Sequence, residues 1–167
     1  MKMYRDKLIE AIVFFANKLR HPSKMMIYKV LAELDFRHYQ ETGIPVTGLI
    51  YEALKKGPVP KKLHREITQQ KDTVLPDDIA NAISLDKEEW TKDNGERGVT
   101  INFKPRRKPN LTLFTPRQQR ILGEVADIYR DASATDSSRV KVGKPLYPNG
   151  SLAPLYGNGG GGARGLP

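Results

Sequence analysis

The feature that most constrains the fold is a wide apolar stripe near the start of the sequence. Its residues recur at helical spacing, and further apolar residues lie beside them: Leu8, Ile12, Phe15 and Leu19, then Ile9, Val13 and Ala16. A stripe this wide predicts a helix over about residues 4–19 that is covered by other elements on most sides. Since 167 residues can bury one genuine core, we expect one domain with this helix at its centre.

A second helix is predicted directly after the first. His21-Pro22 ends the first helix, and Ser23 is a favourable N-cap for the next. Gly43 can take the left-handed conformation that closes a helix, and Pro45 prevents continuation. The predicted buried face consists of Met26, Ile27, Val30, Leu31 and Leu34.

Prolines and glycines shape the next part of the chain. Residues 46–54 are predicted to be extended. The run Gly57-Pro58-Val59-Pro60 predicts an extended turn, with Pro60 at the first position of a third helix that runs to about Gln70. Between residues 76 and 90 we expect a short helix followed by a less regular stretch.

A small β element and a last helix complete the predicted domain. Apolar and polar residues alternate over 99–103 and again over 111–114, which predicts a two-stranded antiparallel element with the basic segment 104–110 as its loop. Thr115 as N-cap and Pro116 then begin a final helix. Its predicted inner face is Ile121, Leu122, Val125, Ile128 and Tyr129. The fold class is therefore mainly α (α+β), a compact helical domain with a small β element.

The composition changes towards the C-terminus. Glycine, proline and asparagine dominate there, and such sequences behave as flexible coil because they cannot bury enough apolar surface. We expect a domain over residues 1–140 and a flexible, disordered tail over 141–167. Tyr147 and Tyr156 each follow a leucine, so they are candidate anchors for a partner protein.

Charge and missing motifs narrow the function. The 28 Lys and Arg against 19 Asp and Glu give a net charge of +9, which favours an acidic partner, either nucleic acid or an acidic protein surface. There is no cysteine, the three histidines lack metal-ligand spacing, and no phosphate loop or catalytic motif is present. We expect a binding protein that is not an enzyme and has no metal or cofactor.

The sequence also bears on location. No run approaches the ~20 apolar residues that a membrane span needs, and the first residues lack the apolar core of a signal peptide. We therefore expect a cytoplasmic protein without a membrane partner.

Two basic groups are candidates for contact with a partner. Lys61, Lys62 and Arg65 begin the third predicted helix and could contact an acidic protein. Arg117, Gln118 and Arg120 lie in the first turn of the last helix, where such side chains read base edges in DNA-binding helices. The same residues also make an ordinary polar first turn, so both interpretations stay open.

Four motifs in order resemble the signature of the SocA-like Panacea domain family. KMMIYKVL at 24–31, TGIPVTG at 42–48, YEAL at 51–54 and GPVP at 57–60 are similar to the family's KLLY-type helix, TGxPxTG turn, YxAW and GPVP motifs. Leu54 replaces the family's tryptophan. The matching residues, which we interpret mainly as scaffold, are Lys24, Tyr28, Thr42, Gly43, Pro45, Gly48, Tyr51, Gly57, Pro58, Val59 and Pro60.

The resemblance carries expectations about function. It implies an antitoxin that neutralises a cognate toxin, encoded by an adjacent gene, through direct protein–protein binding. It supplies no catalytic residues to transfer. Two alternatives remain: a regulator that binds operator DNA, and an adaptor that delivers the toxin to a Clp-type protease.

Overall fold

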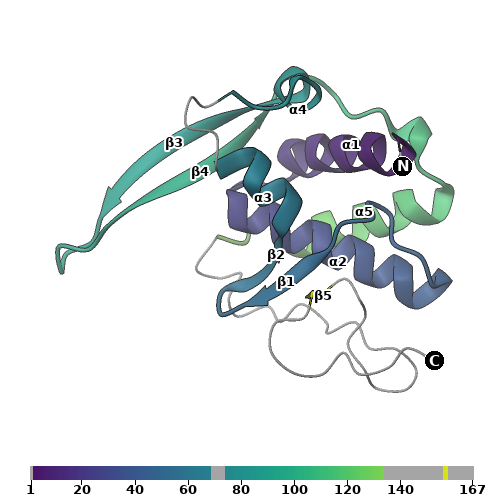
Figure 1. Cartoon of the computed structure of the whole chain (residues 1–167), viewed down its shortest axis with the longest axis horizontal. Coiled ribbons are helices and arrows are strands. Elements are labelled where there is room, and N and C mark those ends of the chain that lie inside the picture. Colours follow the sequence, from purple (N-terminus) through teal and green to yellow (C-terminus); the bar gives the residue numbers. More distant parts are fainter. Residues whose placement is uncertain (1, 69–73, 134–155, 158–167) are drawn as a thin grey trace.

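The computed structural model of the chain describes residues 2–68, 74–133 and 156–157. Three helices form its body: α1 (Lys2–Lys18), α2 (Lys24–Thr42) and α5 (Pro116–Tyr129) (Figure 1). Every residue from 8 to 16 of α1 is buried. The predicted central position of the first helix is therefore confirmed.

The predicted helix ends are confirmed by their hydrogen bonds. The Ser23 hydroxyl accepts a hydrogen bond from the Met26 amide, and Gly43 closes α2 in the left-handed conformation with φ 78°. At the start of α5, Thr115 and Gln118 form a reciprocal capping box. These side chains satisfy amides that a helix end leaves without partners.

A hairpin follows α2 where an extended turn was predicted. Strand β1 (Tyr51–Leu54) pairs antiparallel with β2 (Gly57–Pro60), and α3 (Lys61–Thr68) begins immediately afterwards. Pro60 is thus the last residue of β2, and its predicted place at the first helical position was wrong by one residue. Prolines lack an N–H group but are tolerated on edge strands, and β2 is at the edge of its sheet.

The predicted pairing of residues 99–103 with residues 111–114 was wrong. Strand β4 (Arg97–Pro105) pairs antiparallel with β3 (Ile83–Thr91), which follows the short helix α4 (Asp77–Ala82), and Leu85 lies opposite Phe103. The predicted strand at 111–114 is instead the short 3-10 helix η1 (Leu111–Leu113), because the Asn110 side chain accepts a hydrogen bond from the Thr112 amide. The β3–β4 hairpin projects from the body (Figure 1).

One residue that was predicted to face the core lies at the surface. Ile128 is 49% exposed, and Ala126, which was not part of the prediction, lies on the buried face of α5 instead. Strand β5 (Tyr156–Gly157) pairs parallel with β1 on the edge opposite β2. The rest of the predicted tail, including Tyr147, lies outside the described residues.

Candidate partner-binding site

A buried carboxylate fixes the turn that leads into the site. Asp35 of α2 is fully buried and accepts hydrogen bonds from the amides of Val46 at 2.8 Å and Thr47 at 2.7 Å. The Thr47 hydroxyl also donates to it, and so does the Tyr51 hydroxyl at 3.0 Å. Four donors from residues 46–51 therefore converge on one side chain, and β1 begins at the last of them.

The electrostatics of Asp35 agree with this role. Burial raises the pKa of Asp35 to about 6, while the hydrogen bonds from Thr47, Tyr51 and Val46 act in the opposite direction. The four donors around its oxygens offset part of the cost of burying this carboxyl group. Asp35 is a positioning residue that we did not predict from the sequence. The available signal was a carboxylate between Leu34 and Phe36 in an apolar part of the helix.

The start of the same turn is held by His38 of α2 and by residues of the TGIPVTG motif. His38 is buried, and its Nδ1 lies 2.8 Å from the Ile44 carbonyl oxygen. The Thr42 hydroxyl donates to the His38 carbonyl oxygen at 2.7 Å, and this bond ties the last turn of α2 to itself. Gly48 has φ 66° and lies directly against the Tyr4 ring. This arrangement agrees with our interpretation of these residues as scaffold.

Tyr28 and His64 join α2 to α3. Tyr28 is fully buried, its hydroxyl lies 3.1 Å from His64 Nδ1, and the two rings meet edge to face. Burial raises the pKa of the Tyr28 hydroxyl. Burial and the nearby charge of Lys24 lower the pKa of His64. The contact fixes α3 beside the start of α2, next to the β1–β2 hairpin.

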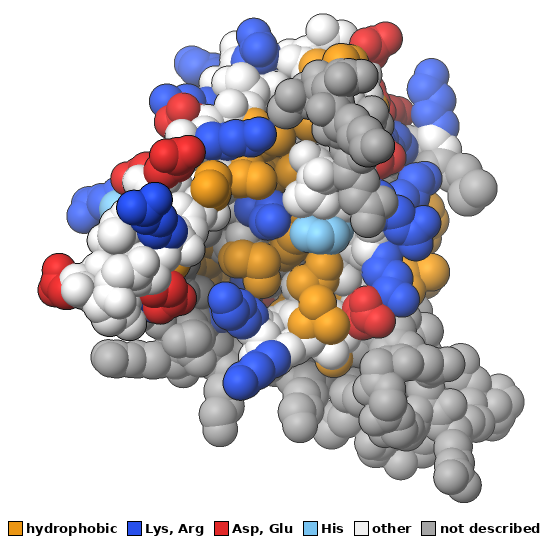
Figure 2. All heavy atoms as spheres, turned by 60° about the vertical axis from the view of Figure 1, so that its left-hand side comes forward, with side chains coloured by type: hydrophobic (Ala, Val, Ile, Leu, Met, Phe, Trp, Pro, Cys, Tyr) orange, Lys and Arg blue, Asp and Glu red, His pale blue; other side chains and the backbone are white. Residues whose placement is uncertain are grey.

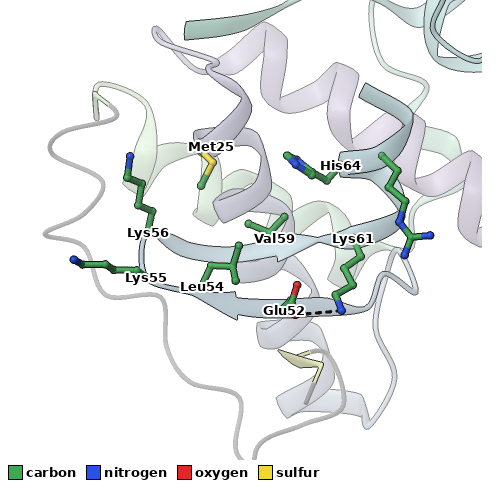
Figure 3. Close-up of a pocket in the computed structure, with 9 residues that line it drawn as sticks. Met25, Glu52, Leu54, Lys55, Lys56, Val59, Lys61 and His64 are labelled. Carbon is green, nitrogen blue, oxygen red and sulfur yellow. Dashed lines mark ion pairs between the residues drawn. The ribbon is translucent and has the colours of Figure 1, made fainter. Parts of the chain in front are cut away.

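These contacts assemble a pocket of about 470 Å³, which we call the basic pocket. Figure 3 shows residues of α2, the β1–β2 hairpin and α3 around it. The lining residues are Met25, Glu52, Leu54, Lys55, Lys56, Val59, Lys61, His64 and Arg65. This volume lies within the range of ~300–1,000 Å³ that is usual for binding sites.

The lining combines apolar side chains with cations. Met25, Leu54 and Val59 supply the apolar part, and Leu54 is 52% exposed. Among the lining residues that the structure describes, four are Lys or Arg, and Glu52 is the one carboxylate, paired with Lys61 at 3.2 Å. Figure 2 shows hydrophobic side chains in a hollow of this side of the molecule, with Lys and Arg side chains around them. Such a surface is chemically suited to an acidic partner with apolar groups.

The structure brings together two of the three basic residues predicted for partner contact. Lys61 and Arg65 line the basic pocket. Lys62 lies on the same helix, is exposed and is not part of the lining. Tyr156 belongs to β5 beside β1, where only the backbone pairing is described. Their role in binding stays a prediction.

The three residues predicted to read DNA are engaged by protein groups. Arg120 forms ion pairs with Glu41 at 2.7 Å and Glu124 at 3.0 Å, and Arg117 lies 3.4 Å from Glu41. Gln118 is buried, and its side-chain oxygen accepts hydrogen bonds from Lys7 and from the Thr115 amide. This arrangement favours the interpretation of an ordinary first turn, while DNA contact stays an untested prediction.

The residues that the structure describes contain neither a cluster of potential metal ligands nor a helix that could span a membrane. No group of three or more His, Asp or Glu side chains there could hold a metal ion. Among the same residues, no helix combines the length and apolar character that crossing a membrane requires.

Comparison with known families decides the classification. The chain matches the family model described as antitoxin SocA-like, Panacea domain, over residues 27–142, which is more than half of its length. The chain belongs to this family. The match confirms the resemblance that the four motifs indicate. Searches of the curated proteins and of the solved structures gave no significant match.

Membership sets a coarse function for this Panacea-domain protein. An antitoxin family implies a toxin as partner. The basic pocket lies in the part of the chain that the motifs cover: Leu54 and Val59 belong to the third and fourth motifs, and Lys61 follows directly.

Proposed function

We propose that this protein is the antitoxin of a toxin–antitoxin pair and that it neutralises the toxin by direct binding. The contact face contains the β1–β2 hairpin and α3. Family membership supports the antitoxin role, and the basic pocket supports this choice of face. The toxin is the product of a neighbouring gene.

The single observation that supports this contact face is an exposed apolar surface surrounded by basic side chains. Leu54 is half exposed at the end of β1, beside Lys55 and Lys56 of the hairpin turn. Interface energy is concentrated in a few central residues, with other contacts around them that exclude water. A stable complex buries about 1,200–2,000 Å² in total, so the pocket would be the centre of a larger contact.

Growth rescue tests the function. The neighbouring gene product is expressed alone and together with the full chain, and the two proteins are then purified by a tag on either one. We expect arrest of growth by the neighbour alone, rescue by coexpression and a stable complex. A toxic neighbour that is neither rescued nor bound would contradict the proposal.

Two matched variants test the face. Leu54→Asp and Val99→Asp each place a carboxylate on a half-exposed hairpin residue, 52% and 55% exposed. We expect Leu54→Asp to abolish rescue and copurification, because it inserts a charge into the apolar centre of the interface. Val99→Asp on β4 should retain both. The reverse result would assign toxin binding to the β3–β4 hairpin and reject the proposed face.

A further inference from the structure

We propose that the basic pocket takes an acidic segment of the toxin, with an apolar side chain held between carboxylates. The inference rests on the proposed function and names the chemistry of the partner at that site. In this arrangement the apolar side chain lies against Met25, Leu54 and Val59, and the flanking carboxylates pair with cations at the two ends of the pocket.

The apolar floor is built from two layers. Leu54 and Val59 come from the paired strands β1 and β2, and Met25 comes from the first turn of α2 above them (Figure 3). Val59 is buried and Leu54 is half exposed, so the floor opens outward on the β1 side. Covering Leu54 with an apolar side chain removes apolar area from water on both partners, which favours binding.

Cations lie at both ends of this floor. Lys55 and Lys56 occupy the turn between β1 and β2, and Lys61 lies at the far end of the hairpin (Figure 3). Arg65 follows Lys61 by four residues on α3, so both side chains lie on one face of that helix. Two separated groups of positive charge select a segment with carboxylates on both sides of its apolar residue.

The carboxylate in the pocket does not neutralise these cations. Glu52 pairs with Lys61 in a geometry where the two side chains are 31% and 53% exposed. Exposed ion pairs of this kind contribute little to stability. A carboxylate of the partner can therefore join or replace Glu52 at Lys61 at small cost.

The wall on the α3 side is fixed before binding. The contact of Tyr28 with His64 Nδ1 holds the imidazole against the buried face of α2. A pocket whose wall is already ordered loses less conformational entropy when a partner binds.

The lining favours a protein segment over nucleic acid. Single-stranded nucleic acid is held by aromatic side chains on which the bases stack, and the described residues of the lining include no Phe, Tyr or Trp. Its centre is aliphatic, which suits a leucine-like side chain. Nucleic acid is the competing outcome of the test below.

Fluorescence anisotropy with a labelled octapeptide tests the inference on the full chain. The peptide contains two leucines among six aspartates and glutamates. The matched probes are a peptide with serine in place of leucine and an oligothymidylate of the same length. We expect the leucine peptide to bind most tightly and its affinity to fall as salt rises, because the cations are exposed.

Two variants on one helix locate the binding. Arg65→Glu changes a lining residue, whereas Lys62→Glu makes a comparable charge reversal outside the lining. We expect Arg65→Glu to weaken peptide binding about tenfold or more and Lys62→Glu to weaken it clearly less, because Arg65 lines the pocket and Lys62 is not among the lining residues. Thermal unfolding of both variants should match that of the unmodified chain.

Several results would overturn the inference. They are the absence of peptide binding, equal weakening by both variants, equal binding of the serine peptide, or tighter binding of the oligonucleotide. The two proposals fail separately. Rescue of growth that Arg65→Glu leaves intact, with no peptide binding, rejects the acidic segment and keeps the antitoxin function. Failure of the unmodified chain to rescue rejects the function, whatever the peptide does.

Discussion

Two neighbouring stretches of this chain, residues 42–51 and 54–65, use their side chains in opposite ways. In the first, Thr47 and Tyr51 are buried and donate hydrogen bonds to Asp35. In the second, Leu54, Lys55 and Lys61 are exposed around the basic pocket. We call them the buried stretch and the exposed stretch. Both lie within or beside the motifs of the Panacea signature, so the signature combines scaffold with surface.

The difference shows how the buried stretch positions the exposed one. Tyr51 is the last donor to Asp35 and also the first residue of β1. The direction of β1, and with it the place of Leu54 and the lysine turn, is therefore set by a buried hydrogen-bond network. Changes at Thr47 and Tyr51 should therefore affect folding, and changes at the exposed side chains Leu54, Lys55 and Lys61 should affect binding alone.

The largest expected effect is that of Asp35→Ala. The substitution leaves the buried amides of Val46 and Thr47 without an acceptor, and each unsatisfied buried group costs about 1–3 kcal/mol. We expect the free energy of unfolding in urea to fall by about 3–5 kcal/mol. Leu54→Ser in the exposed stretch is the control, with a change near 0.5 kcal/mol. Similar losses for both variants would break the comparison.

The pH dependence of stability tests whether Asp35 titrates as a buried carboxyl group. Its pKa is about 6 in the folded chain against an ordinary 3.8, so folding favours the protonated form. Its contribution is therefore fully present below about pH 4 and is lost as the pH rises through about 6. The difference in unfolding free energy between the unmodified chain and Asp35→Asn should fall by about 2 kcal/mol between pH 4 and pH 7. A difference that is constant with pH would contradict the buried, titrating carboxylate.

The smallest expected effect separates two glycines of the buried stretch. Gly43 and Gly48 both have positive φ, but a Cβ on Gly43 meets no atom within 4 Å, whereas one on Gly48 lies 3.0 Å from Tyr4 Cγ. We expect Gly43→Ala to cost about 1 kcal/mol from backbone strain alone. Gly48→Ala should cost about 2 kcal/mol, because strain and crowding add. Equal losses in thermal or urea unfolding would show that the Tyr4 contact is unimportant.

The helices were the most predictable part of this protein. Ser23, Gly43, Thr115 and Pro116 act within a few residues of the helix ends that they define. Such local signals can be recognised in the sequence alone. The apolar spacing of α1 likewise placed it correctly in the core.

The strands were predicted less well, because pairing is decided by distant residues. Ile83–Thr91 contains the run Asp86-Lys87-Glu88-Glu89, which shows no apolar alternation and does not indicate a strand. It is a strand because β4 pairs along its whole length. Conversely, residues 111–114 alternate like a strand, but a local side-chain bond at Asn110 and the lack of a partner strand produce a 3-10 helix.

The candidate site was found in part. Lys61 and Arg65 were predicted from charge alone, whereas Met25, Leu54 and His64 join them only when α2, the hairpin and α3 pack together. Asp35 carried no sequence signal beyond its place in an apolar run, since its partners are 11–16 residues away in the chain.

The sequence by itself determined the helix ends, the central apolar helix, the positive charge and the Panacea family, because each depends on neighbouring residues or on motifs read in order. The tertiary structure alone decided which strand pairs with β4, which donors meet Asp35 and which side chains surround the basic pocket. Those outcomes depend on contacts between distant residues, whose free energy is gained only when the chain closes around them.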